Sequence, residues 1–521
     1  MIRVRQVKVE IEKDNLLEKI AKKLKVKQEE IINYKIVKKS IDARDKKSIY
    51  YVYEVDVELT NQNKIKLSSD ILITPKEEYS YEVTGKEKIN QVVIVGSGPA
   101  GLFCAYMLSE AGYNPIIIEQ GEPIEERVKT VEEFFKTNKL NPLSNIQFGE
   151  GGAGTFSDGK LNTLVKDKRF IGKKVFEIFV ENGAPEEIMY LNKPHIGTDI
   201  LRKVIVNMRN KIISQKGEFK YNSKLTDIVI ENNKVKEIEI NNKEIIPCDV
   251  LVLAIGHSSR DTFKMLYDKG FSMKNKNFAV GVRVEHPQEM INKNQYGDKY
   301  KLLPPADYKL TYQTKTGRGV YSFCMCPGGF VVNASSENKR LVVNGMSNYH
   351  RDERNANSAL VVTVSNKDFG EDVLGGVEFQ RKLEEKAYTL GKGLIPVQLY
   401  KDYKNNVITK ELGSITPNTK GSYNFANLNE LFPNDINNSL KEAIEYFSTK
   451  IKNYNRDDMI MLGVESRTSS PVIIERDKDN VSNYEGIYPC GEGCGYAGGI
   501  TTASMDGIKV FESIISKYTK K

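Results

Sequence analysis

A chain of 521 residues is too long to fold around one hydrophobic core, so its length predicts two or three domains. With 40% hydrophobic and 28% charged residues, the composition is typical of a soluble globular protein. No uncharged apolar run is long enough to span a membrane, and the charged N-terminus MIRVRQVKVEIEKDN is unlike a secretory signal. We therefore expect a cytoplasmic protein whose 6 cysteines form no disulfide scaffold.

The first tenth of the chain carries most of the net charge of +8, since residues 1–47 contain 15 Lys+Arg against 8 Asp+Glu. A basic segment can bind nucleic acid or another acidic partner. A small domain with a solvated lysine face explains the same charge, and we favour that interpretation.

Residues 1–88 predict a small α+β domain. Residues 2–12 alternate as in a strand, Leu16, Leu17, Ile20 and Leu24 have helical spacing, and two more strands are expected near 33–39 and 49–59. This order is typical of a ferredoxin-like arrangement, which ends in the polar stretch TGKEKIN. The segment contains no cysteine, so an iron–sulfur cluster is excluded here.

Residues 91–121 have the pattern of a dinucleotide-binding strand–turn–helix–strand unit. A buried strand over residues 92–95 is followed by Gly96, Gly98 and Gly101 in G-x-G-x-x-G spacing. The three glycines allow a tight turn, close approach to a pyrophosphate, and close helix–strand packing. The N–H groups at the start of the helix favour phosphate. Glu119, at the end of the second strand, is placed to accept from ribose hydroxyls and argues against a 2′-phosphate.

The chain beyond Glu119 predicts further parts of the same domain. A polar helix is followed by a second glycine-rich segment over 149–159, which implies close approach to a ligand or a mobile loop. Residues 219–246 resemble a β-meander with a turn at Asn232–Asn233, and a buried strand over 250–255 ends at Gly256.

Residues 273–460 are less regular and predict a substrate-type domain inserted into the nucleotide-binding domain. Strands are expected at AVGVRVE, GGFVVNA and RLVVNGM, with a helix near 438–453. The nucleotide-binding domain therefore comprises 89–272 and 461–521. Its last part, GIYPCGEGCGYAGGITTASMDGIKV, predicts a strand, a glycine turn and a closing helix.

Three distant segments, namely residues 96–119, the strand ending LVLAIGH and the C-terminal CGEG…GGITTA, occur in an order that resembles the FAD-binding fold of two-dinucleotide flavoproteins and their relatives. In that fold a Gly-Asp pair places a carboxylate on the ribityl chain, and the next helix directs its N-terminus at the flavin. Gly491–Glu492 match the pair, with Glu in place of the usual Asp. The cofactor-binding residues predicted in this way are Gly96, Gly98, Pro99, Ala100, Gly101, Glu119, Gln120, Arg127, Gly152, Gly154, Gly256, Gly491, Glu492, Gly499, Ile500 and Thr501.

The resemblance extends over nearly the whole chain. Together with the N-terminal domain, the segments FGEGGAGTFSDGKL, KPHIGTD, SFCMCPGG, GVESRTSSPV and YPCGEGCGYAGGI look like those of the bacterial FAD-dependent dehydrogenases of uncharacterised activity. More distantly the chain resembles single-Rossmann flavoproteins with an inserted substrate domain, including the succinate dehydrogenase and tRNA-modifying groups. The resemblance implies an α/β fold with a Rossmann-type domain, FAD as cofactor and a redox role.

No second G-x-G-x-x-G follows a strand, because the glycines at 391–393 come after a helix-like segment. NAD(P)H is therefore expected at most as a transient electron donor, and a substrate or redox partner is the alternative source of electrons.

Four residues are candidates for catalysis. His195 and His286 can move protons near neutral pH, or serve only as structural histidines. Arg467, flanked by hydroxyls, suits a substrate carboxylate or an inter-domain ion pair. Lys160, in the second glycine-rich segment with Asp158, would stabilise reduced flavin or lie solvated on a loop.

The pairs Cys324/Cys326 and Cys490/Cys494 lack the C-x-x-C spacing of zinc and thioredoxin-like sites. We expect no metal site, and small-residue packing is favoured over a flavin-coupled disulfide.

These observations predict an FAD-dependent oxidoreductase that transfers a hydride between the flavin and an organic substrate. The alternative is a flavoprotein that acts on RNA or binds it through the basic N-terminal domain. We expect a small-molecule substrate or redox partner and no membrane association.

Overall fold

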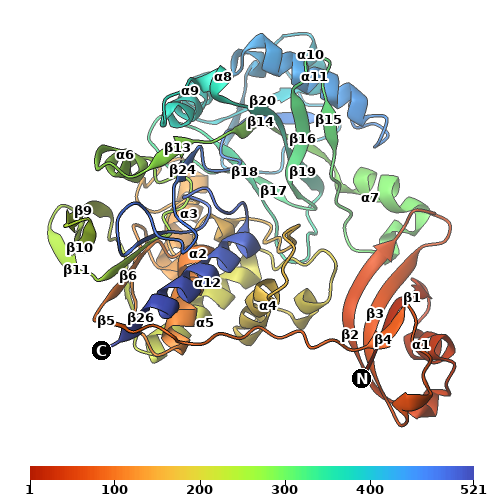
Figure 1. Ribbon diagram of the computed structural model, residues 1–521. Coiled ribbons are helices and arrows are strands. Elements are labelled where there is room, and N and C mark those ends of the chain that lie inside the picture. Colours follow the sequence, from red (N-terminus) through yellow and green to blue (C-terminus); the bar gives the residue numbers. More distant parts are fainter.

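The computed structural model describes residues 1–521 and shows three main sheets (Figure 1). A four-stranded sheet lies at one end of the molecule, a five-stranded parallel sheet lies at the other, and a seven-stranded sheet belongs to the insert. The α/β fold class predicted from the sequence is confirmed. None of the helices combines the length and the apolar character that a bilayer crossing needs.

The N-terminal sheet has the strand order β2-β3-β1-β4 with antiparallel neighbours, as in a ferredoxin-like fold. Apolar residues of β1 and β3 pack on the helix α1 because alternate strand residues share one face. Where a second helix would stand there is only a short 3₁₀ turn, Gln62–Lys64. The elements are β1 (Ile2–Glu10), α1 (Leu16–Leu24), β2 (Ile31–Asp42), β3 (Tyr50–Leu59) and β4 (Ile71–Ile73).

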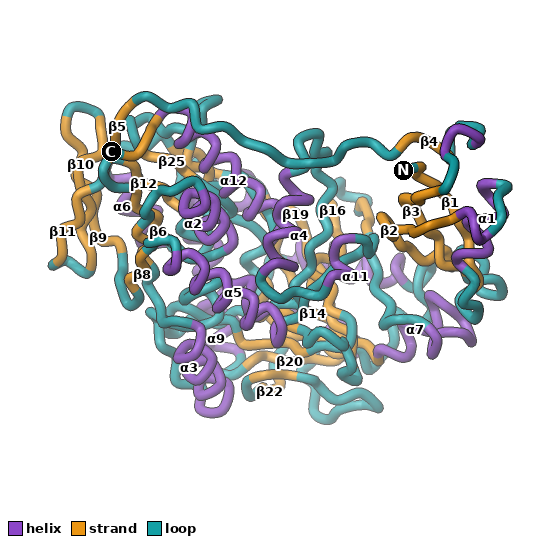
Figure 2. The backbone as a smooth tube through the Cα atoms, turned by 90° about the horizontal axis from the view of Figure 1, so that it is seen from below, coloured by secondary structure: helices purple, strands orange, loops and turns teal.

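Residues 74–89 run as an extended strap from this sheet to the nucleotide-binding domain (Figure 2). The Tyr79 hydroxyl donates to Glu512 at 2.9 Å, and Tyr81 packs edge-on against Phe511. At its end β5 (Glu87–Ile89) pairs with β26 (Tyr518–Lys520). Residues 74–88 fall within the predicted N-terminal domain, but Tyr79 and Tyr81 are partly buried in the core that includes α12 (Ile500–Lys517).

The nucleotide-binding domain is built on a parallel sheet of order β25-β12-β6-β7-β8. Alternate residues of each strand enter different cores. One core packs against α2, α4, α5 and α12, and the other packs against the β9–β11 meander and α6. The strands are β6 (Val92–Val95), β7 (Ile116–Ile118), β8 (Glu218–Lys220), β12 (Val250–Leu253) and β25 (Ile487–Pro489). The covering elements are α2 (Pro99–Glu110), α3 (Ile124–Thr137), α4 (Ile171–Glu181), α5 (Thr198–Ser214), α6 (Arg260–Asp268), β9 (Leu225–Glu231), β10 (Lys234–Ile240) and β11 (Glu244–Pro247).

The insert centres on a sheet of order β15-β16-β19-β14-β23-β20-β22. Its large apolar core lies between this sheet and the helices that cover it, which include α11. The sheet strands are β14 (Phe278–Pro287), β15 (Thr311–Gln313), β16 (Gly319–Cys326), β19 (Asn355–Val364), β20 (Ile395–Leu399), β22 (Tyr423–Phe425) and β23 (Ile460–Glu465).

The remaining elements of this part of the chain lie around this sheet, except β13 and β24, which pack in the core that contains the β9–β11 meander. The short strands β17 and β18 pair with each other, and β13 pairs with β24. These elements are β13 (Met273–Asn275), α7 (Gln288–Tyr296), β17 (Phe330–Asn333), β18 (Val343–Met346), α8 (Asn366–Phe369), α9 (Gly375–Leu390), α10 (Tyr400–Lys404), β21 (Thr419–Lys420), α11 (Asn434–Phe447) and β24 (Val472–Ile474).

Candidate functional site

One cavity of about 540 Å³ lies between the nucleotide-binding domain and the insert, and we call it the central cavity. The turns that follow β6, β12 and β25 contribute to its wall, as expected for a ligand site at the carboxyl ends of parallel strands. The insert contributes residues of β16 and β18, including Cys324, Cys326 and Asn344. The three glycine segments found in the sequence therefore meet at one site.

The first glycine turn has the geometry that its sequence predicts. Gly96 has φ +102°, and a Cβ there would lie 2.2 Å from the Ala254 carbonyl oxygen. Gly98 opens onto the cavity, where the helix α2 begins at Pro99. A Cβ on Gly101 would lie 1.9 Å from the Gly96 oxygen, so Gly101 serves helix–strand packing and does not line the cavity.

Glu119 lies at the cavity wall beside Gln120, but its carboxylate is already bonded. Ser97 donates to Oε2 from its backbone N–H at 3.0 Å and from its hydroxyl at 2.7 Å. The backbone N–H groups of Gly121 and Gly149 donate to Oε1, each at 2.9 Å. Because a carboxylate has about four acceptor positions, these protein donors occupy them all. Contact between Glu119 and a ribose stays a prediction that requires the Ser97 hydroxyl to turn away.

Arg127 was predicted to bind the cofactor, and the structure places it elsewhere. Its buried guanidinium donates to the carbonyl oxygens of Asn145, Ile146, Gly149, Glu150 and Gly152 at 2.6–3.1 Å. Burial lowers the pKa of Arg127 to about 10. The side chain thus shapes the loop that brings Gly152 and Gly154 to the cavity wall. A Cβ on Gly152 would lie 2.9 Å from the Gly98 Cα, so the two glycine segments touch.

The strand β12 and the C-terminal turn form the adjoining wall. Gly256 has φ +73° and no atom within 4 Å of a Cβ placed there, and it lines the cavity with Gly499 and Ile500. Two residues of the predicted set point elsewhere. Gly491 is packed against Ala100, and the Thr501 hydroxyl donates to the Leu161 carbonyl at 2.6 Å.

Glu492 lines the cavity, and its carboxyl group forms no hydrogen bond within the protein. Burial raises the pKa of Glu492 to about 7, against the opposing charge of Lys276. The group can therefore hold or release a proton near neutral pH. Its place agrees with the Gly-Asp position inferred from the resemblance.

Lys160 lines the cavity and contacts residues of both the nucleotide-binding domain and the insert. Its ammonium group donates to the Met325 carbonyl of the insert and lies 3.9 Å from Asp158 Oδ2. The Arg351 guanidinium also holds Asp158, with Nε donating to Oδ1 at 2.8 Å. Burial alone would raise the pKa of Asp158, but Arg351 and Lys160 outweigh it and lower that pKa.

The two histidine candidates do not reach the cavity. The His195 backbone bridges to Lys160, but its ring donates through Nε2 to the Tyr349 carbonyl at 2.8 Å. Burial and Arg351 lower the pKa of His195. His286 is wrong as a cavity residue, because β14 turns it to the same face as Val282 and Val284, in the insert core. There it donates to the Tyr454 carbonyl at 2.7 Å, and burial lowers its pKa to about 4.

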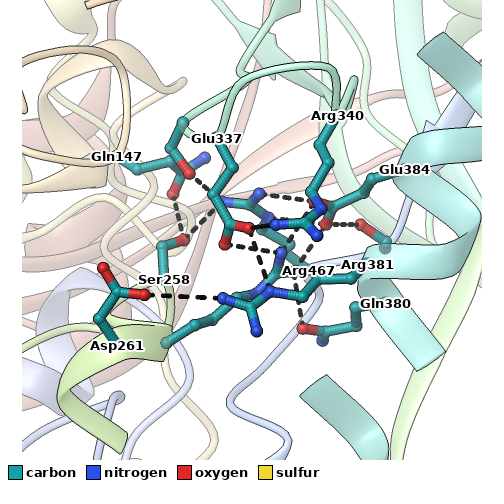
Figure 3. Close-up of polar contacts among 12 residues, drawn as sticks. Gln147, Ser258, Asp261, Glu337, Arg340, Gln380, Arg381, Glu384 and Arg467 are labelled. Carbon is teal, nitrogen blue, oxygen red and sulfur yellow. Dashed lines mark hydrogen bonds and ion pairs between the residues drawn. The ribbon is translucent and has the colours of Figure 1, made fainter. Parts of the chain in front are cut away.

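Arg467 reaches the cavity wall but is not free to bind a carboxylate. Its Nε and Nη2 donate to the two oxygens of Glu384 at 2.9 and 2.8 Å, and its Nη1 donates to Ser258 and Ser336 (Figure 3). Arg467 is therefore held in an ion pair within the insert, since it follows β23 and Glu384 lies on the helix α9. Two residues near the cavity have no sequence pattern that predicts their role, namely Glu384, which pairs with Arg467, and Arg351, which pairs with Asp158. Each is recognisable only through a contact with a residue that is distant in sequence.

Comparison with known proteins agrees with this site. A family model described as "FAD-dependent protein, C-terminal domain-like" matches residues 277–468, and one described as "FAD binding domain" matches residues 91–128. A domain of unknown function matches residues 1–58. An uncharacterized protein of Clostridium beijerinckii is 49% identical over 531 residues, which cover 99% of each chain.

Similar solved structures are distant. E. coli quinol fumarate reductase FrdA is 12% identical, with 81% of this chain and 69% of that chain covered and a TM-score of 0.36. Glycine oxidase from Bacillus cereus is 10% identical, with 82% of this chain and 98% of that chain covered and a TM-score of 0.36. L-proline dehydrogenase from P. horikoshii is 13% identical, with 82% of this chain and 93% of that chain covered and a TM-score of 0.31. TM-scores this low add nothing to the family assignment. The full-length match establishes that the chain belongs to the same family as the Clostridium beijerinckii protein, and the two FAD-related models identify it as an FAD-binding protein.

Proposed function

We propose that the protein transfers a hydride between FAD and a small polar organic substrate bound at the insert end of the central cavity. The observation that supports this proposal is the continuity of the cavity. One end is lined by the glycine segments of the nucleotide-binding domain, and the other is lined by insert side chains that include Ser322 and Asn344. A cofactor and a substrate can therefore meet without solvent between them.

The residues present fit FAD. Glycines without side chains leave room along the turns after β6 and β12, and the helices α2 and α12 begin at the cavity wall. When bound there, FAD supplies a centre that accepts or donates two electrons. The first backbone N–H groups of α12, beside Gly499, provide positive potential for negative charge that develops in the site.

Two side chains have roles in proton and charge balance under this proposal. The Lys160 ammonium group stabilises negative charge at the wall between the two ends of the cavity, since it is fixed between Asp158 and the Met325 carbonyl. Glu492, with a pKa of about 7, holds a proton at low pH and releases it as the pH rises.

The test is flavin reduction followed anaerobically in a stopped-flow spectrophotometer. The FAD-loaded protein is mixed with NADH, NADPH and a panel of small hydroxy acids, amino acids and unsaturated carboxylates. Lys160→Gln should bind FAD and be reduced at least about tenfold more slowly, whereas Lys168→Gln, with an exposed side chain, should behave as the wild type. A flavin that no compound reduces, or equal rates in wild type and Lys160→Gln, would overturn the proposal.

The alternative of an RNA-bound flavoprotein stays a prediction. Many basic side chains of the N-terminal sheet are paired with acids, among them Arg3 with Asp56, Lys8 with Asp42 and Lys23 with Asp70. This pairing favours a solvated protein surface over a nucleic-acid site. Salt-dependent retention on heparin, lost on deletion of residues 1–73, would support the alternative.

A further inference from the structure

The strand β16 ends in a bulge that carries two cysteines. Against β19, Phe323 pairs with Ala359 and Cys326 pairs with Asn357, so β16 has one residue more than its partner across this step. Cys324 adopts φ +41°, in the left-handed region that a non-glycine residue rarely enters. Bulges of this kind redirect side chains and are frequent beside functional sites.

Both thiols line the central cavity as a result. Cys324 is exposed to it, and Cys326 is buried beside it, with its Sγ 3.3 Å from the Cys324 carbonyl oxygen. Two residues apart in sequence, their Cα atoms can be separated by at most ~7 Å, and disulfides form at Cα separations of about 4.4–6.8 Å. A disulfide between them therefore requires only local adjustment of the bulge.

Two cationic side chains lie beside Cys324 and Cys326, and a glycine leaves space next to Cys326. Arg283 Nη1 lies 4.0 Å from Cys326 Sγ and donates to the Cys324 carbonyl at 3.1 Å, while Lys160 donates to the carbonyl of the intervening Met325. Positive charge beside a thiol favours the reactive thiolate. Gly345 keeps the space open, because a Cβ there would lie 2.7 Å from Cys326 Sγ. The surrounding protein nevertheless desolvates the Cys324 thiol, which acts in the opposite direction and raises its pKa to about 12.

The other cysteines lack this combination of features. Cys104 and Cys248 lie in apolar cores, and Cys494 donates to the Leu253 carbonyl at 3.1 Å. Cys490 is fully buried even though it borders the cavity. Cys324 is the one cysteine that the cavity exposes, and Cys326 is its neighbour.

We propose that Cys324 and Cys326 form a redox-active dithiol that exchanges electrons with FAD. This second redox centre rests on FAD binding and goes beyond the hydride transfer proposed above. On oxidation the pair loses two S–H bonds and gains one S–S bond, and it passes two electrons and two protons to FAD. Reduction of the disulfide by reduced FAD reverses each change.

The first test maps the thiols directly. Trypsin cleaves after Arg318 and Lys339, so the peptide 319–339 contains both cysteines and no other. FAD-loaded protein kept in air, where oxygen reoxidises the flavin, should yield this peptide as the disulfide, lighter by two hydrogens and resistant to iodoacetamide. FAD-free protein treated in the same way should yield the doubly alkylated peptide. A fully alkylated peptide from the air-exposed, FAD-loaded protein would overturn the proposal.

The second test counts electrons. Anaerobic titration of the air-oxidised, FAD-loaded protein with dithionite should consume twice as many reducing equivalents per FAD in the wild type as in Cys324→Ser or Cys326→Ser. Cys248→Ala, a change at a buried position that does not line the cavity, should match the wild type. Equal consumption in all four proteins would refute the dithiol. Neither test requires a substrate. The results therefore do not depend on whether the protein transfers a hydride to or from a substrate, and failure of the dithiol proposal is distinguishable from failure of the hydride-transfer proposal.

Discussion

Glu384 of the helix α9 and Arg467, just after β23, form a bidentate ion pair in which both side chains are almost fully buried. Arg260 of α6 donates to the same carboxylate at 2.7 and 2.9 Å. One carboxylate of the insert thus connects two arginines, one of them in the nucleotide-binding domain and one at the cavity wall. Burial alone would raise the pKa of Glu384, but the two arginines hold it well below its usual range.

Removal of this carboxylate should be severely destabilising, because it leaves the buried Arg467 guanidinium without an ionic partner and leaves Arg260 with Glu337 alone. We expect Glu384→Ala to lower the free energy of unfolding by about 3–5 kcal/mol. The adjacent Glu385 pairs with Arg340 at the surface, so Glu385→Ala should cost no more than about 1 kcal/mol. Urea denaturation of both variants measures the difference, and similar losses would contradict the assigned role.

A carboxyl group with a raised pKa makes the folded state less stable as the pH rises. Glu492 has a pKa of about 7 in the fold and 4.5 as its reference value, so between these values the unfolded chain releases the proton first. The stabilisation is complete below about pH 4.5 and is lost as the pH rises through 7. Glu492→Gln keeps the uncharged form at every pH. Relative to the wild type, we expect the FAD-free variant to gain less than about 1 kcal/mol at pH 5 and up to about 3 kcal/mol at pH 8.

Thermal denaturation of the FAD-free proteins at the two pH values provides the measurement. Glu58→Gln, at an exposed position of the N-terminal sheet, is the matched control and should show no pH-dependent gain. A gain for Glu492→Gln that is the same at pH 5 and pH 8 would show that the carboxyl group is not uncharged in the fold.

The glycine cradle could be predicted from the sequence because its requirements are local. Gly96 and Gly101 have no room for a side chain in any protein with this strand, turn and helix, so their spacing carries the information. The individual polar contacts depend on tertiary structure. The Glu384 side chain that occupies Arg467 lies 83 residues away in the chain, and the loop carbonyls that bind Arg127 show no pattern in the sequence.

The position of His286 follows from a local pattern in the sequence. In β14, strand alternation places His286 with Val282 and Val284, which indicates a core position. For this residue the face of the strand is a better guide than the residue type. The domain boundaries at 88, 272 and 460 stay predictions, although the strap over 74–89 shows that the chain leaves the N-terminal sheet before residue 88.

Gly98 allows a substitution that separates cofactor binding from folding. A Cβ on Gly98 would meet only the Gly152 Cα, at the ordinary contact distance of 3.7 Å, and would project into the cavity. We expect Gly98→Ala to fold with nearly unchanged stability and to bind FAD at least about tenfold more weakly. Gly96→Ala, whose Cβ would collide with the Ala254 carbonyl, should lose both stability and FAD binding. Flavin fluorescence titration and thermal denaturation distinguish the two, and undiminished FAD affinity in Gly98→Ala would contradict the cradle.

Arg127 should act on FAD binding through the loop that it holds, without touching the cofactor. Replacement by Met keeps much of the volume but leaves carbonyl groups of residues 145–152 unpaired in the interior, at a cost of about 1–3 kcal/mol for each group that water cannot reach. We therefore expect Arg127→Met to lower the free energy of unfolding by about 3 kcal/mol or more and to weaken FAD binding, because the loop carries Gly149 and Gly152. Lys129→Met, at an exposed position of the same helix, should stay within about 0.5 kcal/mol of the wild type.

Hydrogen exchange tests whether Arg127 acts on FAD binding by ordering this loop. The exchange of residues 145–154 should increase in Arg127→Met and remain unchanged in Lys129→Met. Weakened FAD binding with unaltered exchange in that loop would instead place the Arg127 side chain in direct contact with the cofactor.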